Sequence, residues 1–445
     1  MTVDWAKHKA VVVESDDWGG CAVYVARDYE SYLRMTQTPP ILEALMKQPS
    51  RFWAWLPGTL ETPADMRKMF ELLLRFRGAD GRPAVFTPVY LVANPDFDAI
   101  RDNGCTEYVD IPICEGFPSR FDPVRWNHEE MLAEAKRGMA LGVWHPQTHG
   151  RVHHWSPRKW VRSLREAADE ALTAFFELGM VGMPLDQDRL RELKGLEFDD
   201  LTDEELDEWF GKGLEYFRRA FGYETPVAPI TNAVWARAEQ PDLERRCEQM
   251  LARHGVNFNS HSYKAREQGQ GLYDPELDLT FMGWNSQLDP LGLPDCEAEK
   301  GFTTCYRRIE EAWAKGEPAI VGAHRANYVS LDPVAGSEGY GQLERLLSAL
   351  TKEHPDLVFL TSWEVGQLYR KGWSCVRYGS DLICRNYSDT ECEMTWPFEV
   401  TGSVSEAFSL PDGPTCAAGV EDGRVTLTAP EGDYLIRVED SGHDD

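Results

Sequence analysis

The sequence predicts an α/β protein built around a parallel β-sheet, and two observations lead to this class. Short apolar runs rich in β-branched residues alternate with segments whose apolar residues recur at helical spacing. Two polar motifs directly follow predicted strands, at the edge where parallel sheets collect their ligands. This alternation fits a sheet that is either open or closed into a barrel.

The predicted elements follow in order along the chain. Amphipathic periodicity predicts helices over residues 64–76, 128–139 and 340–353. Predicted strands cover residues 10–13, 52–56, 85–91, 108–113, 140–144, 226–230, 256–259, 279–282, 319–323 and 357–361. We expect a helical insertion over residues 155–222, with long charged helices at 158–178 and 203–221. It either forms one side of a substrate cleft or only packs against the sheet.

The pattern of apolar and polar residues changes near residue 371. Short segments of alternating apolar and polar residues follow, broken by Gly, Asp and Pro. We therefore expect one α/β domain over residues 1–370, a small antiparallel β-domain over residues 371–438, and an acidic tail at 439–445.

Charge and composition narrow the functional classes. Asp and Glu number 74 against 46 Lys and Arg, a net charge of −28 that disfavours nucleic acid and anionic membrane as partners. No run approaches the ~20 apolar residues of a membrane helix, and the first residues lack the pattern of a secretory signal. The 10 cysteines include no Cys-x-x-Cys pair, which favours reduced thiols. We expect a cytoplasmic protein, and the sequence leaves its oligomeric state open.

The segment 144–154 is the first candidate site, because it holds four of the 11 histidines. Neutral imidazole is the commonest protein ligand for transition metals. On a helical turn, residues four apart share a face, which pairs His149 with His153 or with His145. The spacing predicts His149 as a metal ligand, with His153 preferred over His145 as the second.

Two further segments carry groups suited to acid-base chemistry. Asp16 and Asp17 follow the apolar run 10–13, so their carboxylates emerge where a buried strand ends. Adjacent side chains point different ways, so one carboxylate can bind a cation while the other accepts a proton from a metal-bound water. His324 ends the apolar run 319–323 and suits a general acid that protonates a leaving group.

With these motifs the chain resembles the polysaccharide deacetylase-like family, of the carbohydrate esterase family 4 type within the glycoside hydrolase/deacetylase superfamily. The resemblance rests on Ser-Asp-Asp-Trp-Gly at 15–19, His-Gly-Arg-Val-His at 149–153 and His-Arg-Ala-Asn-Tyr at 324–328. It implies a distorted (β/α) barrel of about seven strands, the (β/α)7 type. It also implies hydrolysis of N- or O-acetyl groups on a carbohydrate by water activated on a divalent metal, zinc ahead of other ions. Asp16 would be the base, Asp17, His149 and His153 the metal ligands, and His324 the acid.

Two positions depart from that family's pattern. Gly150 follows His149 where Ser or Thr is typical, and no arginine precedes Pro229 to orient the base. Arg151 or Arg325 could take over that role. The residues expected to contact substrate are Arg151, Arg325, Trp18, Asn232 and Tyr328, and other tryptophans near strand ends could stack on sugar rings.

Two other functions remain open at this point. The first is a glycan-cleaving enzyme that uses paired carboxylates drawn from Asp16, Asp17, Glu14 or Glu364. The second is a carbohydrate-binding protein without catalytic activity. A barrel permits many chemistries, so the fold alone does not decide among them.

Overall fold

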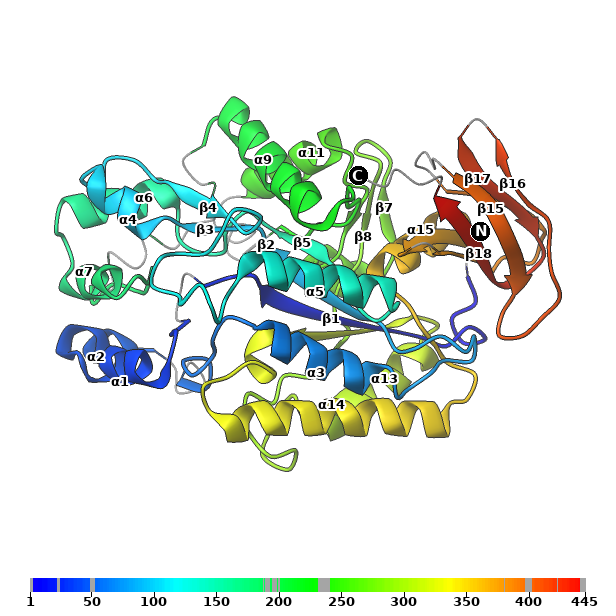
Figure 1. Ribbon diagram of the computed structural model, residues 1–445, viewed down its shortest axis with the longest axis horizontal. Helices are drawn as coiled ribbons and strands as arrows, with labels where there is room; N and C mark the ends of the chain where they lie inside the picture. Colours follow the sequence, from blue (N-terminus) through cyan, green and yellow to red (C-terminus); the bar gives the residue numbers. More distant parts are fainter. Residues whose placement is uncertain are drawn as a thin grey trace.

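The core of the molecule is a six-stranded sheet in which β1 (Ala10–Trp18) is central (Figure 1). The computed structural model describes residues 3–21, 25–48, 53–186, 188, 193, 198, 201–230, 241–379, 381–396, 402–421 and 423–440. The strand order is β5-β2-β1-β10-β9, with β11 pairing the start of β1, and every pairing is parallel. The partners of β1 are β2 (Phe86–Leu91), β10 (Ala319–His324) and β11 (Val358–Phe359), and the outer strands are β5 (Gln147–Gly150) and β9 (Ser286–Gln287). The predicted α/β class with a parallel sheet is confirmed.

The sheet is covered on both faces, which explains the unbroken apolar runs in its strands. Residues 10–13 of β1 and 319–323 of β10 are buried. In Figure 1, α5 (His128–Ala140) runs along one side of β1, and α3 (Pro63–Leu73), α13 (Phe302–Ala314) and α14 (Pro333–Glu353) run along the other. The predicted helices at 64–76, 128–139 and 340–353 correspond to α3, α5 and α14.

Smaller sheets flank this core. β6 (Phe258–Asn259), β8 (Leu279–Phe281) and β7 (Leu272–Asp274) form one, and β3 (Ala93–Pro95) with β4 (Asp110–Pro112) forms an antiparallel pair. The remaining helices before the insertion are α1 (Tyr29–Gln37), α2 (Pro39–Met46) and α4 (Phe97–Asp102). Within the described ranges, no strand pairing closes the sheet into a barrel.

Three of the predicted strands were wrong. Residues 226–230 form only an isolated bridge, between Val227 and Phe258. Residues 140–144 contain the end of α5 and a turn at Gly142 (φ +72°), and the strand begins only at Gln147. Residues 53–56, the described part of the predicted strand 52–56, form a short 3-10 helical segment followed by a turn. The strand predicted at 108–113 exists as β4, but it pairs antiparallel outside the main sheet.

The helical insertion lies at the top and left of Figure 1. Its first predicted helix is two helices, α6 (Pro157–Arg165) and α7 (Glu170–Glu177), because Ala167 adopts a positive φ of 46° and the Asp169 side chain caps α7. Its second is α9 (Asp203–Phe221), as predicted. Two further helices, α11 (Pro241–Arg253) and α12 (Tyr263–Gln268), lead back toward the core.

After α15 (Ser362–Lys371) the chain forms two antiparallel sheets, at the right of Figure 1. One has the order β12-β13-β18-β15 and the other β14-β17-β16. Their strands are β12 (Trp373–Tyr378), β13 (Asp381–Asn386), β14 (Cys392–Thr395), β15 (Gly402–Ser409), β16 (Ala418–Glu421), β17 (Arg424–Ala429) and β18 (Gly432–Asp440). Antiparallel strands in this part of the chain agree with the alternating pattern of the sequence.

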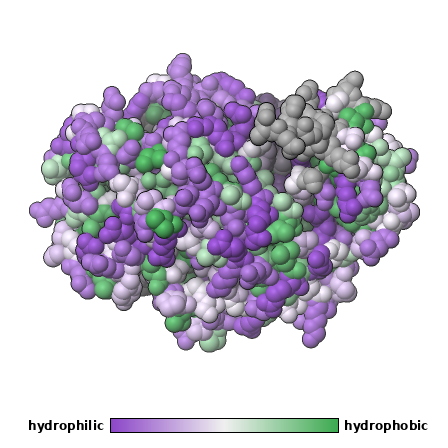
Figure 2. Space-filling view, in the orientation of Figure 1, coloured by the Kyte–Doolittle hydropathy of each residue, from purple (hydrophilic) through white to green (hydrophobic). Residues whose placement is uncertain are grey.

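The surface fits the acidic composition. The face in Figure 2 is predominantly hydrophilic, with apolar side chains scattered across it. Among the described residues, no helix combines the length and apolar character needed to cross a bilayer. All 10 cysteines are free thiols.

Candidate functional site

Asp16 and Asp17 lie at the carboxyl end of β1, the central strand. In the parallel pairing of β1 with β10, Asp16 is in register with His324, which places the first and third sequence motifs side by side. The pairing of β1 with β2 shifts register between Ser15 and Trp18, and Asp17 adopts a left-handed φ of 69°. Such bulges redirect side chains at the ends of strands and recur beside active sites. Here the bulge brings both carboxylates to one site.

His149 reaches the same site from β5, two strands away from β1. The β2–β5 pairing is irregular at His149, and Gly150 follows with a φ of +100°, so the chain turns sharply there. This turn returns His153 toward His149, with ring centroids 4.9 Å apart. The two histidines meet through a strand and a turn, so the helical turn expected for this segment was wrong. Gly150 supplies the turn where Ser or Thr was expected.

Asp17, His149 and His153 form a group whose potential ligand atoms lie within 4.8 Å of one another. His149 Nε2 is 3.6 Å from Asp17 Oδ1 and 3.4 Å from Asp16 Oδ2. Neither ring nitrogen of His149 has a hydrogen-bond partner among the described residues, although the side chain is buried. A buried polar atom without a partner costs free energy. Two imidazoles and a carboxylate, grouped around the ring nitrogens of His149, fit a divalent cation.

His261, after β6, completes a second group with Asp16 and His149. Its Nδ1 is 3.4 Å from Asp16 Oδ2, and its Nε2 is 3.1 Å from Glu14 Oε2. Glu14 is fully buried and also accepts hydrogen bonds from Trp284 Nε1, at 2.7 Å, and from Ser362. This chain of contacts holds His261 against Asp16.

His261 was missed by the sequence reasoning. The signal was a histidine two residues after the predicted strand 256–259, at the same edge as the other motifs. It takes the orienting position for which Arg151 and Arg325 were considered. Both arginines are engaged elsewhere, so that expectation was wrong for both.

Burial controls the protonation of the candidate metal ligands. It lowers the pKa of His149 well below its usual range, and the neighbouring His153 and His261 lower it further. Burial also lowers the pKa of His153, against the charge of Asp17. Both imidazoles are therefore neutral at pH 7, which is the form that binds metals. Burial, followed by the charges of Asp17 and Glu14, raises the pKa of Asp16 well above its usual range.

His324 faces the site at the end of β10. Its Nδ1 is 3.1 Å from Asp289 Oδ2, and Asn327 Nδ2 donates a hydrogen bond to the other Asp289 oxygen. Burial opposes the charged imidazolium, but the Asp289 carboxylate outweighs it and raises the pKa of His324. The rings of Trp55 and Trp284 lie 4.5 and 5.6 Å from the His324 ring. Asp289 was also missed from the sequence, where it stands alone without a motif.

Two side chains considered for the site lie elsewhere. His145 is buried among the rings of Tyr223, Trp363 and Tyr378, and burial lowers its pKa to about 4. It is absent from both candidate metal groups, so the alternative ligand is set aside. Glu364 closes the capping box of α15 and is 2.9 Å from Arg385 Nε, which gives it a structural role.

The expected substrate contacts divide into three cases. Trp18 and Tyr328 are buried in the aromatic core against Phe86, so their expected contact with substrate was wrong. Arg325 is buried and pairs with Glu61 at 3.1 Å, and Glu61 accepts a hydrogen bond from the Gly19 amide. Arg325 therefore stabilises the turn after β1 rather than contacting the substrate. Asn232 lies outside the described residues.

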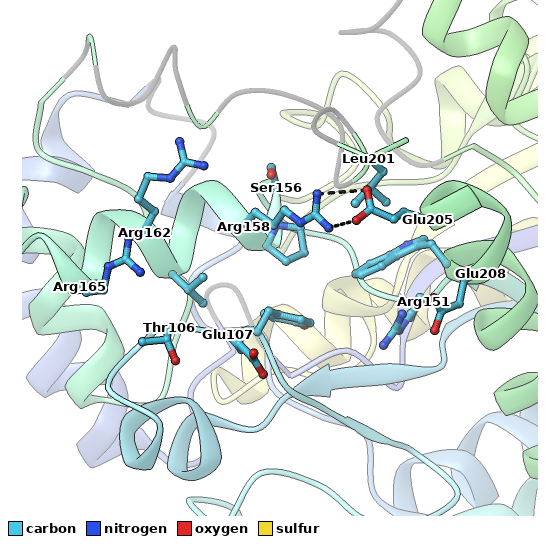
Figure 3. Close-up of a pocket in the computed structure, with 14 residues that line it drawn as sticks. Thr106, Glu107, Arg151, Ser156, Arg158, Arg162, Arg165, Leu201, Glu205 and Glu208 are labelled. Atoms are coloured by element: carbon cyan, nitrogen blue, oxygen red, sulfur yellow. Dashed lines mark hydrogen bonds and ion pairs between the residues drawn. The ribbon is translucent and has the colours of Figure 1, made fainter. Parts of the chain in front are cut away.

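Arg151 lines a pocket of about 560 Å³ between α6 and α9 (Figure 3). Its guanidinium donates to both oxygens of Asp110, at 2.6 and 3.1 Å, and stacks on Trp209 with 4.2 Å to the ring centre. Figure 3 shows Arg158, Arg162 and Arg165 of α6 on the same pocket, with Arg158 held by Glu205. Arg151 thus remains a candidate for substrate contact on this wall of the insertion.

The comparisons with known proteins identify no family. The sequence matches no family model and no curated protein. Solved structures do match in arrangement. A probable polysaccharide deacetylase from Pseudomonas aeruginosa PAO1 gives a TM-score of 0.41 at 8% identity, over 83% of this chain and 95% of that one. A putative polysaccharide deacetylase from Mycobacterium smegmatis gives 0.36 at 10%, over 82% and 91%. The Puue allantoinase gives 0.39 at 9%, over 82% and 92%.

These TM-scores are all below 0.5, and the identities are at most 10%. Such matches carry no argument about activity. Function has to be argued from the side chains of the site.

Proposed function

We propose that this protein is a metal-dependent hydrolase that removes N- or O-acetyl groups from a carbohydrate. The observation that carries the proposal is the group of Asp17, His149 and His153, in which buried His149 has two ring nitrogens without a hydrogen-bond partner among the described residues. Asp16 and His324, in register on adjacent strands, flank this group with the two groups that acid-base hydrolysis needs.

Asp17, His149 and His153 would hold a divalent cation, with zinc first among the candidates. Two imidazoles and one carboxylate leave coordination positions for water and substrate, as catalytic sites require. When bound, such an ion brings the pKa of its water toward neutrality and polarises the acetyl carbonyl group.

The chain's own residues would perform the proton transfers. Asp16 accepts the proton of the attacking water, while His261 and Glu14 keep its carboxylate in place. Asp289 holds Nδ1 of His324, which leaves Nε2 to donate a proton to the departing sugar oxygen or nitrogen. The water oxygen thus ends in acetate, and the sugar gains a free hydroxyl or amine.

A carbohydrate substrate agrees with the aromatic rings around His324. Trp55 is partly exposed and meets the His324 ring edge-on, whereas Trp284 is buried and packs against His261 with ring centroids 4.6 Å apart. Flat apolar rings of this kind stack on sugar faces. Within this proposal, the parallel sheet belongs to a distorted barrel over residues 1–370, and the β-strands of residues 371–438 form a small β-domain packed against it.

The first test is metal content by mass spectrometry, paired with acetate release from acetylated sugars. Wild type and a His128→Ala control, altered away from the site, should each retain about one zinc or similar ion per chain. His149→Ala should lose it. Asp16→Asn should keep the ion and lose acetate release, because it removes the base and not a ligand.

Three outcomes would contradict the proposal. The first is a wild-type protein that carries no ion and gains no activity from added metal. Release of reducing ends without acetate would instead indicate glycan cleavage by Asp16 and Asp17. Sugar binding without turnover, unchanged in Asp16→Asn, would indicate a binding protein.

A further inference from the structure

Arg120, between β4 and α5, is half-buried, and its guanidinium has no carboxylate partner among the described residues. Its Nη2 donates to the carbonyl oxygen of Cys21, and its Nε is buried and has no hydrogen-bond partner among the described residues. No ion pair within the described ranges includes it. Arginine is seldom buried unless it is paired, because an uncompensated charge in the interior is expensive.

The other charges near Arg120 are already engaged. Arg120 lines a pocket of about 220 Å³ together with Arg27, Arg34 and Arg101. Arg27 pairs with Asp28 at 3.1 Å, Arg34 with Glu30 at 3.4 Å, and Arg101 with Asp98 at 2.8 Å. Carboxylates therefore pair with these three arginines, and the remaining carboxylate of the pocket, Glu177, lies 3.9 Å from Arg101 and is in no ion pair with Arg120 among the described residues.

Arg120 is also held rigidly. Its guanidinium lies 4.4 Å from the ring centre of Phe121, and Gly179, with a φ of +68°, packs against its side chain. A Cβ atom at Gly179 would come within 2.4 Å of Arg120 Cδ, so this close approach requires glycine. Burial, followed by the neighbouring charge of Arg27, lowers the pKa of Arg120 to about 10. A flexible arginine would turn to solvent, whereas this one is fixed at the pocket.

We propose that this pocket binds an oxyanion, a carboxylate, sulfate or phosphate group, whose charge pairs with Arg120. A guanidinium presents several N–H donors in a planar fork that matches these groups. The pocket volume suits one such group with the atoms that carry it rather than a whole oligosaccharide, since pockets for larger ligands start near ~300 Å³.

The place of the pocket in the chain suggests the source of the anion. Cys21, whose carbonyl oxygen accepts from Arg120, lies only four residues after Asp17, a proposed metal ligand. The Cys21 amide in turn donates to Asn94, at 2.8 Å, which fixes this turn beside the end of β1. If the proposed hydrolase activity holds, on which this step rests, the oxyanion is an acidic substituent of the sugar substrate.

The test is calorimetric titration of the full-length protein with sulfate and phosphate, in chloride buffer of constant ionic strength. Wild type should bind one anion, and Arg120→Met should weaken binding by about tenfold or more, since a charged hydrogen-bonding partner is lost. Arg120→Lys should bind with intermediate affinity because it keeps the charge and loses the fork. Arg125→Met is the matched control, an exposed arginine of the same segment that stacks on Trp126, and it should bind as wild type does.

Thermal unfolding of the same variants without anion separates a binding role from a structural one. Arg120→Met should be at least as stable as wild type, because it removes a half-buried charge that has no carboxylate partner among the described residues. Wild type that binds no oxyanion, or variants that all bind alike, would overturn the proposal. So would an Arg120→Met protein that is folded, destabilised and unchanged in anion affinity.

A final comparison identifies the source of the anion. Tighter binding of glucuronate than of glucose or sulfate would assign the pocket to an acidic sugar, and tighter binding of phosphate or sulfate would assign it to a free anion. Because these titrations measure binding without turnover, a protein that binds oxyanions but holds no metal would contradict only the hydrolase proposal.

Discussion

At the scale of single residues, Asp289 sets the proton affinity of the proposed acid, His324. Since His324 must be protonated to act as an acid, activity should fall as the pH rises through its raised pKa. Asp289→Asn removes the carboxylate that raises this pKa, so the basic limb of the kcat/KM profile should move to lower pH. NMR titration of the His324 ring should show the same shift. An unchanged basic limb in Asp289→Asn would exclude His324 as the titrating acid.

The same pair contributes to stability with a defined pH window. The raised pKa of His324 means that its contribution is complete at low pH and is lost as the pH rises through the folded-state value. The pKa of Asp289 is lowered because the charge of His324 and its hydrogen bonds outweigh burial, so its contribution is lost as the pH falls. The pair therefore stabilises the fold most between these two limits.

Gly322 of β10 allows Trp284 to reach the site. A Cβ atom at this position would lie 1.9 Å from the Trp284 ring, which itself contacts Glu14, His261 and His324. Gly322→Ala should lower the free energy of unfolding by about 1–3 kcal/mol through overpacking. It should also lower kcat/KM by roughly a hundredfold, because displaced catalytic groups lose their alignment.

Gly341→Ala is the matched control for this substitution. Gly341 is exposed on α14, and a Cβ atom added there would have no neighbouring atom within 4 Å. Alanine should therefore stabilise the helix by about 0.5–1 kcal/mol and leave activity unchanged. Chemical denaturation and steady-state kinetics on both variants check the contrast. Equal effects of the two substitutions would mean that Trp284 is not seated by Gly322.

The sequence predicted the site residues that belong to a recognisable motif, and it did not predict those whose role depends on packing. Asp17, His149 and His153 come together as their residue types predicted, although the helical turn expected to pair the two histidines was wrong. Trp18 follows the same strand end, but it turns into the core, and no spacing rule reveals which face a bulged residue takes. His261 and Asp289 are single residues whose value lies in a partner far away in the chain.

At the scale of secondary structure, a buried guanidinium is one of the contacts that join the chain after α15 to the core. Arg385 of β13 donates to Asp80, Glu364 and Asp433 at 2.8 to 2.9 Å, and its side chain is 1% exposed. Arg385→Met would leave three carboxylates without their cation, so the free energy of unfolding should fall by about 3–5 kcal/mol. Arg437→Met, which breaks the exposed pair with Glu406, should cost no more than about 1 kcal/mol.

The pH dependence of this contact has a clear sign. The charge of Arg385 outweighs burial and lowers the pKa of Glu364, so this stabilisation is present at neutral pH and is lost as the pH falls through the folded-state value. Urea unfolding of wild type and Arg385→Met should therefore differ most near neutrality and converge in acid. A constant difference between them at all pH values would contradict an ionic contact.

Helices and strands were predicted correctly where the apolar pattern was long and incorrectly where it was short. α9 and α14 have extended periodicity, and both were found. The apolar residues Val143 and Trp144 were taken for a strand, but they enter the core directly after a helix ended by Gly142. An extended chain rises about 3.3 Å per residue, so the stretch that leads into β5 separates His145 from His149, whereas the turn at Gly150 returns His153 to His149.

At the scale of the whole molecule, the segment just before β1 packs against the C-terminal sheets. His8 stacks on Tyr387 with ring centroids 4.1 Å apart, and its Nε2 lies 2.8 Å from Glu431. Only one residue separates His8 from β1, the strand that carries Asp16 and Asp17. The C-terminal sheets thus contact both the start of the central strand and, through Arg385, the helix α15. No short sequence pattern could predict these contacts, since they join segments hundreds of residues apart.

This coupling predicts that the α/β core and the C-terminal sheets unfold together. Calorimetry should give one transition whose measured enthalpy equals the van't Hoff enthalpy, coincident with the loss of circular dichroism and of tryptophan burial. Independent domains would instead unfold in separate steps, which is the usual behaviour of chains with several domains. The Arg385→Met variant makes the test sharper. Without the Arg385 contacts, the C-terminal sheets should unfold at a lower temperature than the α/β core. A single transition that shifts as a whole would instead show that the remaining contacts are enough to couple the two parts.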